Sequence, residues 1–312
     1  MAQQTVRLQE RKIGFTAYLR KYWFLYVLAV PGIAFLAVFS YGPMYGLLLA
    51  FKDLNMGAGI LKSPWAGLDH FKTIFSYPEI TRAIMNTLAI NALNLLFGFT
   101  FVIFLALMLN ELRFKKVKSV AQTFVYLPYF LSWIVFSGII QTFLAPDYGL
   151  VNSILAALGK GQIVFLSEAG LYRWILVVAN IIKTSGYSTI IYLAAIAGVS
   201  PELYESAKVD GANRFHMIRH ITLPRIVPTI AVLLILQLAG MFSANFDMVY
   251  TTYSPMVFET GDVISTYIYR VGIGKAQYEV GTAMGLVFNG LSFLVIIAAN
   301  KLIRKMDVMG IF

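Results

Sequence analysis

Long apolar stretches separated by shorter charged ones are the dominant pattern of this sequence. Lys183 is the single charge within six such stretches, which occupy 22–51, 83–110, 120–144, 175–192, 226–246 and 280–300. A helix of about 20 apolar residues spans the hydrocarbon core of a bilayer. Because backbone groups in lipid must satisfy their own hydrogen bonds, helices are the expected form. We therefore predict an all-α polytopic membrane protein with six transmembrane helices.

The Lys and Arg residues predict the orientation of these helices, since cytoplasmic loops carry an excess of both. An N-terminus inside the cell makes four segments cytoplasmic: 1–21, 110–119, 198–225 and 301–312. It makes three segments face outward: 52–82, 145–174 and 247–279. The first group holds sixteen basic residues and the second holds eight. We therefore predict that both termini are cytoplasmic, that 22–300 is the membrane domain, and that 1–21 can lie on the lipid of the inner leaflet.

Composition narrows the possible functions. Hydrophobic residues make up 59% of the chain and charged residues 13%, against about a quarter charged in a soluble domain. The absence of cysteine excludes disulfides, cysteine-ligated zinc and thiol catalysis. The net charge of +10 does not indicate a nucleic-acid partner, because most basic residues lie near the ends of the apolar stretches, where they act as topology signals.

The charged stretch between the fourth and fifth apolar runs predicts a pair of short cytoplasmic helices. Ser200 is a suitable cap and Pro201 a suitable first residue for one helix. Gly211 permits a turn, after which a second helix is expected over 213–220, and Pro224 begins the fifth span. Two helices at an angle make a projection, at about 201–220, that fits a groove on a cytoplasmic partner.

The residues of this projection resemble the EAA motif of ABC importer permeases. The matching residues are Glu205, Ser206, Ala207, Asp210, Gly211, Ala212, Ile221, Leu223 and Pro224. The family pattern is Glu-Ala-Ala, then a glycine four residues later, then Ile-x-Leu-Pro. This chain departs from it at Ser206, where alanine is usual and where serine is similarly small.

Other segments are similar to the sugar-importer branch of that family, which includes permeases for maltose, glycerol phosphate and larger oligosaccharides. They are Gly67-Leu68-Asp69-His70-Phe71, Asn86-Thr87-Leu88, Tyr126-Leu127-Pro128 and Asp262-Val263-Ile264-Ser265-Thr266-Tyr267. Within this branch the chain is most similar to the subgroup associated with complex polysaccharide fragments.

The resemblance implies a type I importer permease that works by alternating access in the bacterial cytoplasmic (inner) membrane. The implied partners are a second homologous permease subunit, two ATPase subunits, an extracytoplasmic solute-binding protein and an oligosaccharide. The implied ATPase-coupling residues are Glu205, Ser206, Ala207, Asp210, Gly211, Ala212, Leu223 and Pro224. The chain has no Walker A loop, since neither Lys160 nor Lys275 has the required glycine and hydroxyl neighbours. ATP and Mg are therefore expected on the partner ATPase, with no cofactor on this chain.

Polar residues inside the apolar runs are candidates for the solute pathway. Asn180, Lys183, Thr184 and Tyr187 share one helix face by their spacing. A cation at mid-membrane is costly unless it meets a wet cavity or a partner. Lys183 therefore either lines the pathway and selects an acidic oligosaccharide, or pairs with a carbonyl or acid of the partner permease. Further candidates for the pathway are Asn245, Asp247 and Asn289.

Other polar patterns favour structural roles. Thr87, Asn91 and Asn94 form a second stripe, which we interpret as hydrogen-bonding contacts between helices. His216 and His220 have a spacing that could hold a metal, but no third ligand is near in the sequence. No catalytic residue is predicted, so the chain is expected to be a transporter subunit. An integral membrane enzyme and a passive channel remain the alternative classes.

Overall fold

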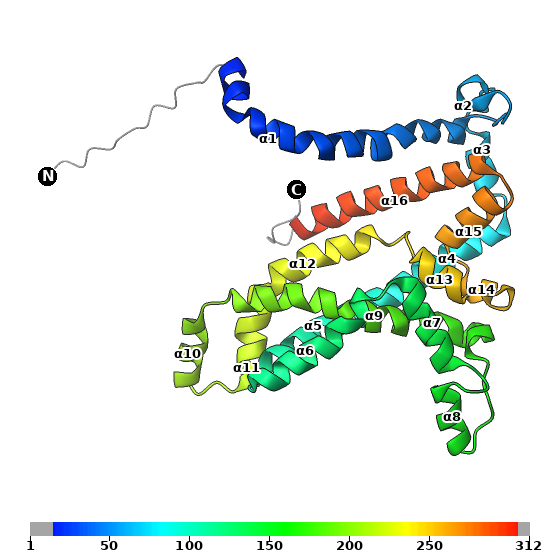
Figure 1. Ribbon diagram of the computed structural model, residues 1–312. Coiled ribbons are helices and arrows are strands. Elements are labelled where there is room, and N and C mark those ends of the chain that lie inside the picture. Colours follow the sequence, from blue (N-terminus) through cyan, green and yellow to red (C-terminus); the bar gives the residue numbers. More distant parts are fainter. Residues whose placement is uncertain (1–14, 305–312) are drawn as a thin grey trace.

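A computed structural model describes residues 15–304 (Figure 1). Within this range the regular secondary structure is all helical, apart from an isolated bridge between Lys52 and Trp65. Most of the predicted segments 1–21 and 301–312 lie outside the described residues. The all-α fold expected from the apolar stretches is confirmed.

Five helical stretches within residues 15–304 are long and apolar enough to cross a membrane. They are Tyr18–Phe51, Pro78–Glu111, Ala169–Ala197, Arg214–Ala239 and Tyr278–Leu302. The first is built of α1 (Phe15–Leu36), η1 (Ala37–Tyr41) and η2 (Gly42–Phe51). The second is built of α4 (Pro78–Leu93), η3 (Asn94–Phe99) and α5 (Thr100–Glu111). The third and fifth of these are single helices, α9 (Ala169–Ala197) and α16 (Tyr278–Arg304).

The apolar run at 120–144 is not one continuous helix, contrary to the sequence prediction. It forms the second part of α6 (Lys115–Phe130) and all of α7 (Trp133–Leu144), which are bent by 106° at the break. Pro128 lies in the last turn of α6, and Ser132 starts α7 by accepting a hydrogen bond from the Val135 N–H. If this bent pair is one span, the chain crosses the membrane six times.

The span before the outer loop at 240–245 also differs from expectation. The second cytoplasmic helix does not stop near residue 220 but continues through α11 (Arg214–Met217), η5 (Ile218–Thr222) and α12 (Leu223–Ala239). Pro224 lies in the first turn of α12, where its missing N–H is tolerated. The fifth span therefore ends at Ala239, seven residues before the predicted end at 246, and a turn then leads into α13 (Phe246–Thr252).

The two ends of the bundle carry different elements. Figure 1 shows the start of α1, the end of α16 and the α10–α11 hairpin at one end, as expected for cytoplasmic termini. The other end carries the remaining short helices: α2 (Gly59–Lys62), α3 (Asp69–Ile74), α8 (Leu150–Ala157), α14 (Phe258–Gly261) and α15 (Ile264–Tyr269). Arg214 contacts Glu111 at 3.2 Å, so α5 ends on the cytoplasmic side. Because α9 begins at the opposite end, α6 and α7 together carry the chain across.

Helix α9 lies at the centre of the bundle, against α5, α6 and α12. Gly186 allows its closest approach to α6, since a Cβ there would lie 2.3 Å from the Val125 carbonyl oxygen. A second close approach joins Gly281 of α16 to Gly272, where a Cβ would meet the Gly272 Cα at 2.9 Å. Small residues permit such contacts between membrane helices.

An ion pair fixes the outer end of the bundle. Arg270 contacts the buried Asp262 at 2.5 Å and lies over the Phe258 ring. Burial acts to lower the pKa of the Arg270 guanidinium, but the hydrogen bond and charge of Asp262 outweigh it and raise this pKa. Asn86 of α4 donates to the carbonyls of Glu259 and Asp262. The segment between α13 and α16 is therefore tied to the second span.

Candidate functional site

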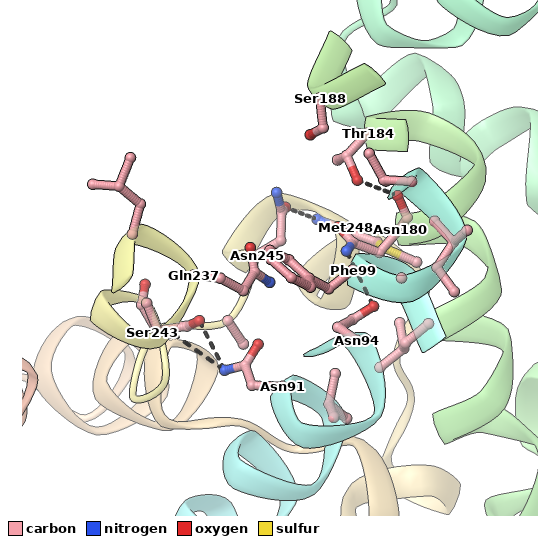
Figure 2. A pocket seen from close by; sticks show the side chains of 18 of the residues that line it. Asn91, Asn94, Phe99, Asn180, Thr184, Ser188, Gln237, Ser243, Asn245 and Met248 are labelled. Atoms are coloured by element: carbon pink, nitrogen blue, oxygen red, sulfur yellow. Dashed lines mark hydrogen bonds between the residues drawn. The ribbon is translucent and has the colours of Figure 1, made fainter. Parts of the chain in front are cut away.

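A cavity of about 380 Å³ lies between the second span, α9, α12 and the start of α13. Its polar side chains come from all of these elements (Figure 2). They are Asn91, Asn94, Asn180, Thr184, Ser188, Tyr192, Gln237, Ser243 and Asn245. No Lys, Arg, Asp or Glu lines this cavity. Its chemistry is therefore that of neutral amides and hydroxyls.

Four of the cavity amides use one end for structural hydrogen bonds, and the other end has no partner within residues 15–304. The Asn91 amide nitrogen donates to the carbonyls of Gly240, Met241 and Ser243, which leaves its oxygen available. The Asn180 nitrogen donates to the Asn94 oxygen at 3.1 Å, as Figure 2 shows. Asn180 thus keeps a free oxygen and Asn94 a free nitrogen.

Asn245 follows the same rule, since its oxygen accepts from the Met248 N–H at the start of α13 and its nitrogen remains available. The side chains of Gln237 and Ser188 make no hydrogen bond within residues 15–304. The cavity therefore offers both donors and acceptors, and those of the four asparagines are held in place by their structural hydrogen bonds. Sugar hydroxyls are donors and acceptors at once, so this lining suits a carbohydrate.

The cavity contains three of the predicted pathway residues, Asn180, Thr184 and Asn245. It does not contain the other four. Tyr187 is 48% exposed and stacks on Tyr129 of α6 with ring centroids 4.4 Å apart. Asp247 is exposed in the first turn of α13, and Asn289 is exposed on α16.

Lys183 points away from the cavity, into the break between α6 and α7. Its ammonium donates to the carbonyls of Pro128, Tyr129 and Leu131 at 3.2, 3.1 and 2.5 Å. The side chain is only 4% exposed, and its Nζ lies 5.0 Å from the centroid of the Trp133 ring. The expectation of an amine facing the pathway is corrected: this cation is bonded to the carbonyl end of α6, where helix carbonyls lack partners and attract positive charge.

Sequence reasoning missed Ser188, Gln237 and Ser243 as lining residues. A signal for Ser188 exists, because Asn180, Thr184 and Ser188 repeat every fourth residue along α9. Asn91 and Asn94 were predicted to join helices, and their hydrogen bonds to the 240–243 turn and to Asn180 confirm this. The same residues also line the cavity, so the two roles coincide.

The cytoplasmic projection consists of α10 (Pro201–Val209), a turn and α11. Gly211 has a φ of +78°, a conformation that favours glycine. The Asn213 side chain caps α11 by accepting from the His216 N–H. Ser200 precedes α10 but makes no side-chain cap bond, contrary to its expected role.

The motif residues divide into an exposed set and a supporting set. Glu205, Ser206, Asp210 and Gly211 are exposed, whereas Ala207 and Ala212 are half-buried. Leu223 and Pro224 begin α12. The Tyr204 hydroxyl lies 2.9 Å from the Thr222 hydroxyl and joins α10 to the start of the fifth span.

Two exposed apolar side chains extend the projection beyond the motif. Val209 is 88% exposed and Phe215 is 66% exposed. A single exposed apolar residue is ordinary on a protein surface, but here the two flank the Gly211 turn. Glu205 is exposed as well and lies four residues before Val209 on the same face of α10.

The histidines of the hairpin have local partners. The His216 Nδ1 lies 3.0 Å from the Asn213 oxygen, and the His220 Nδ1 lies 3.1 Å from the His216 carbonyl. No group of three His, Cys, Asp or Glu residues in the described part of the chain could hold a metal ion. The described residues of the hairpin therefore form no metal centre.

Comparison with known proteins identifies the family to which this chain belongs. Residues 103–308 match the family model described as the binding-protein-dependent transport system inner membrane component. This chain belongs to that family. It is therefore a multi-pass permease of an ABC transporter in the inner membrane, and ATP hydrolysis is performed by a separate subunit.

Individual relatives cover nearly the whole permease. It is 38% identical over 93% of its length to the polygalacturonan/rhamnogalacturonan transport system permease protein YteP of Bacillus subtilis (strain 168), 90% of which is matched. It is 43% identical, with a TM-score of 0.85, to a chain of a bacterial ABC transporter involved in the import of the acidic polysaccharide alginate. That match covers 92% of this chain and 97% of the other.

A second structure shows such a transporter with its delivery protein. The bacterial alginate ABC transporter in complex with an alginate pentasaccharide-bound periplasmic protein matches with a TM-score of 0.87 and 41% identity. The match covers 95% of the permease and 99% of that chain. The type I importer permease fold expected from the sequence is thus confirmed.

Proposed function

We propose that this permease imports oligosaccharides that carry carboxylates, such as uronate-containing polysaccharide fragments. The observation that carries the proposal is the 43% identity, over 92% of the chain, to a permease of an importer of an acidic polysaccharide. The 38% identity to a permease for polygalacturonan and rhamnogalacturonan points to the same class of solute.

The neutral cavity would bind the uncharged groups of such an oligosaccharide. Its free amide ends bind hydroxyls and ring oxygens, which every sugar residue presents. Carboxylate selection does not come from Lys183, because that ammonium is bonded to three carbonyls. Charge selection therefore belongs to the solute-binding protein or to the second permease subunit.

The α10–α11 hairpin is the proposed contact with one of two ATPase subunits, which hold ATP and Mg. Glu205, Val209 and Phe215 provide its exposed surface, and Gly211 its turn. The bonds Tyr204–Thr222 and Arg214–Glu111 join it to the fifth and second spans. Both of these spans line the cavity, so a push on the hairpin can change the cavity shape.

Uptake by the reconstituted importer tests the proposed solute. The complex with its binding protein, in proteoliposomes, is expected to import an oligouronate at least about tenfold faster than a neutral oligomer of equal length. The cavity of this chain is lined by no cation, so the preference comes from the solute-binding protein or the second permease subunit, and a tenfold preference corresponds to about 1.4 kcal/mol. The measurement is initial uptake of labelled oligomers with ATP inside the vesicles. Faster uptake of the neutral oligomer would show that the solute class is wrong.

Replacing Gln237 with methionine tests the cavity. The substitution keeps the shape of the side chain and removes one uncommitted amide, so maximal uptake should fall about fivefold, the effect of losing roughly 1 kcal/mol of hydrogen bonding. Asn289→Ala is the control, because Asn289 is exposed on α16 away from the cavity. Normal uptake by the Gln237 variant together with impaired uptake by the control would place the pathway elsewhere.

A further inference from the structure

Tyr192 has a buried hydroxyl that the fold does not use. Its side chain is 1% exposed, and its phenolic oxygen has no hydrogen-bond partner within residues 15–304. Burial of a hydroxyl without a partner is destabilising, whereas phenylalanine would fill the same space at no such cost. The presence of a tyrosine at this position therefore indicates a hydrogen-bond partner that is absent from the described conformation.

The position of Tyr192 indicates where that partner comes from. Asn180, Thr184, Ser188 and Tyr192 follow one another at every fourth residue of α9, and all four line the cavity. Because α9 runs from the outer end to the cytoplasmic end, Tyr192 is the last of these polar groups on the way into the cell. The stripe thus continues beyond the amide-lined part of the cavity.

Apolar side chains and rings gather at the cytoplasmic end of the cavity. The Phe99 and Tyr192 rings meet edge to face with centroids 6.4 Å apart, and Val102 and Leu233 line the same end. Tyr192 also packs in a cluster with Ile226, close to the start of α12. This cluster joins the cavity to the helix that leads directly from the α10–α11 hairpin.

We propose that the Tyr192 hydroxyl is a solute contact at the cytoplasmic end of the pathway. When the Phe99–Tyr192 cluster separates, the phenol donates a hydrogen bond to an oxygen of the departing oligosaccharide. The described conformation is then the closed state of this end, and the unpaired hydroxyl is its cost. This inference rests on the proposed function, since it takes an oligosaccharide as the solute.

Tyr192→Phe tests the inference, with Tyr172→Phe as the matched control. Tyr172 is also fully buried on α9, but its hydroxyl lies 2.8 Å from the Thr252 hydroxyl. In the reconstituted complex, Tyr192→Phe should leave the thermal midpoint unchanged or raise it, and should lower maximal uptake about fivefold, as expected for a lost hydrogen bond. The half-saturating concentration of loaded binding protein should not change. Tyr172→Phe should lower the midpoint and leave uptake per folded complex unchanged.

Three results would overturn the inference. The first is a Tyr192→Phe complex that is at least as stable as the wild type and imports at the wild-type rate. Such a result would mean that the hydroxyl is an unpaired buried group without a role in transport. The second is a lowered midpoint, and the third is failed assembly, since each means that the hydroxyl has a partner in the resting fold. The comparison uses whichever oligosaccharide the wild type imports best. A wrong solute class therefore appears in the wild type, whereas a wrong role for Tyr192 appears only in the ratio of variant to wild type.

Discussion

Lys183→Met is expected to prevent assembly of a folded permease. At the break between α6 and α7, the substitution leaves the carbonyls of Tyr129 and Leu131 without a donor among residues 15–304, whereas the Pro128 carbonyl keeps the Leu131 N–H. An unsatisfied buried group costs about 1–3 kcal/mol, and a membrane interior offers no water in compensation. The summed loss for two carbonyls is about 2–6 kcal/mol, a large share of the stability of a typical domain. The measurement is the yield and thermal midpoint of the complex after purification in detergent.

Lys72→Met is the control for this experiment. Lys72 forms an exposed pair with Asp69 at 2.8 Å, outside the membrane spans, and exposed pairs contribute little to stability. Yield and midpoint should therefore match the wild type. A well-folded Lys183→Met complex that imports normally would contradict the structural role of the ammonium. A well-folded complex that loses only its preference for oligouronates would instead restore the interpretation of Lys183 as a charge selector.

Glu205→Arg is expected to uncouple ATP hydrolysis from transport while the permease itself stays folded. Glu205 is exposed on α10 and has no salt bridge within residues 15–304, so its reversal disturbs no internal contact. Across an interface, a like-charge contact costs several kcal/mol, which suffices to lower solute-stimulated ATPase by at least about tenfold. The measurement is ATPase activity of the assembled complex with and without loaded binding protein.

Two glycines provide a matched test of the same surface. Gly211 and Gly159 have φ values of +78° and +72°, and neither has an atom within 4 Å of an added Cβ. Alanine at either position therefore costs about 1–2 kcal/mol of backbone strain without a clash. Only Gly211→Ala should lower solute-stimulated ATPase, because Gly159 follows α8 at the opposite end of the bundle. Equal behaviour of the two variants, or normal coupling with Glu205→Arg, would remove the hairpin from the coupling pathway.

The sequence by itself determined the class of fold, the approximate spans and the place of the cytoplasmic hairpin. Uninterrupted apolar runs such as 83–110 and 280–300 allow one outcome, because lipid accepts a backbone only when its hydrogen bonds are internal. The position of the hairpin could also be predicted from the sequence, since Pro201, Gly211 and Asn213 each favour one local conformation. These signals depend only on neighbouring residues, so the sequence is enough to interpret them.

The break between α6 and α7 could not be predicted from the sequence. Hydropathy measures transfer into lipid and carries no information about a bend within an apolar run. It therefore predicts one helix over 120–144. Pro128 is compatible with a bend but also occurs in membrane helices without one. What permits the 106° bend is the donor that satisfies the freed carbonyls, and that donor lies more than 50 residues further along the chain.

Only the tertiary structure decided which side of α9 faces the cavity. Helical spacing places Asn180, Lys183 and Thr184 on one broad face, but that face is wider than the cavity. Packing of Gly186 against α6 rotates Lys183 toward the broken end of that helix, while Asn180 and Thr184 turn toward α12 and the second span. A helix face is a local property, whereas the neighbour that each edge of the face meets depends on segments distant in the sequence.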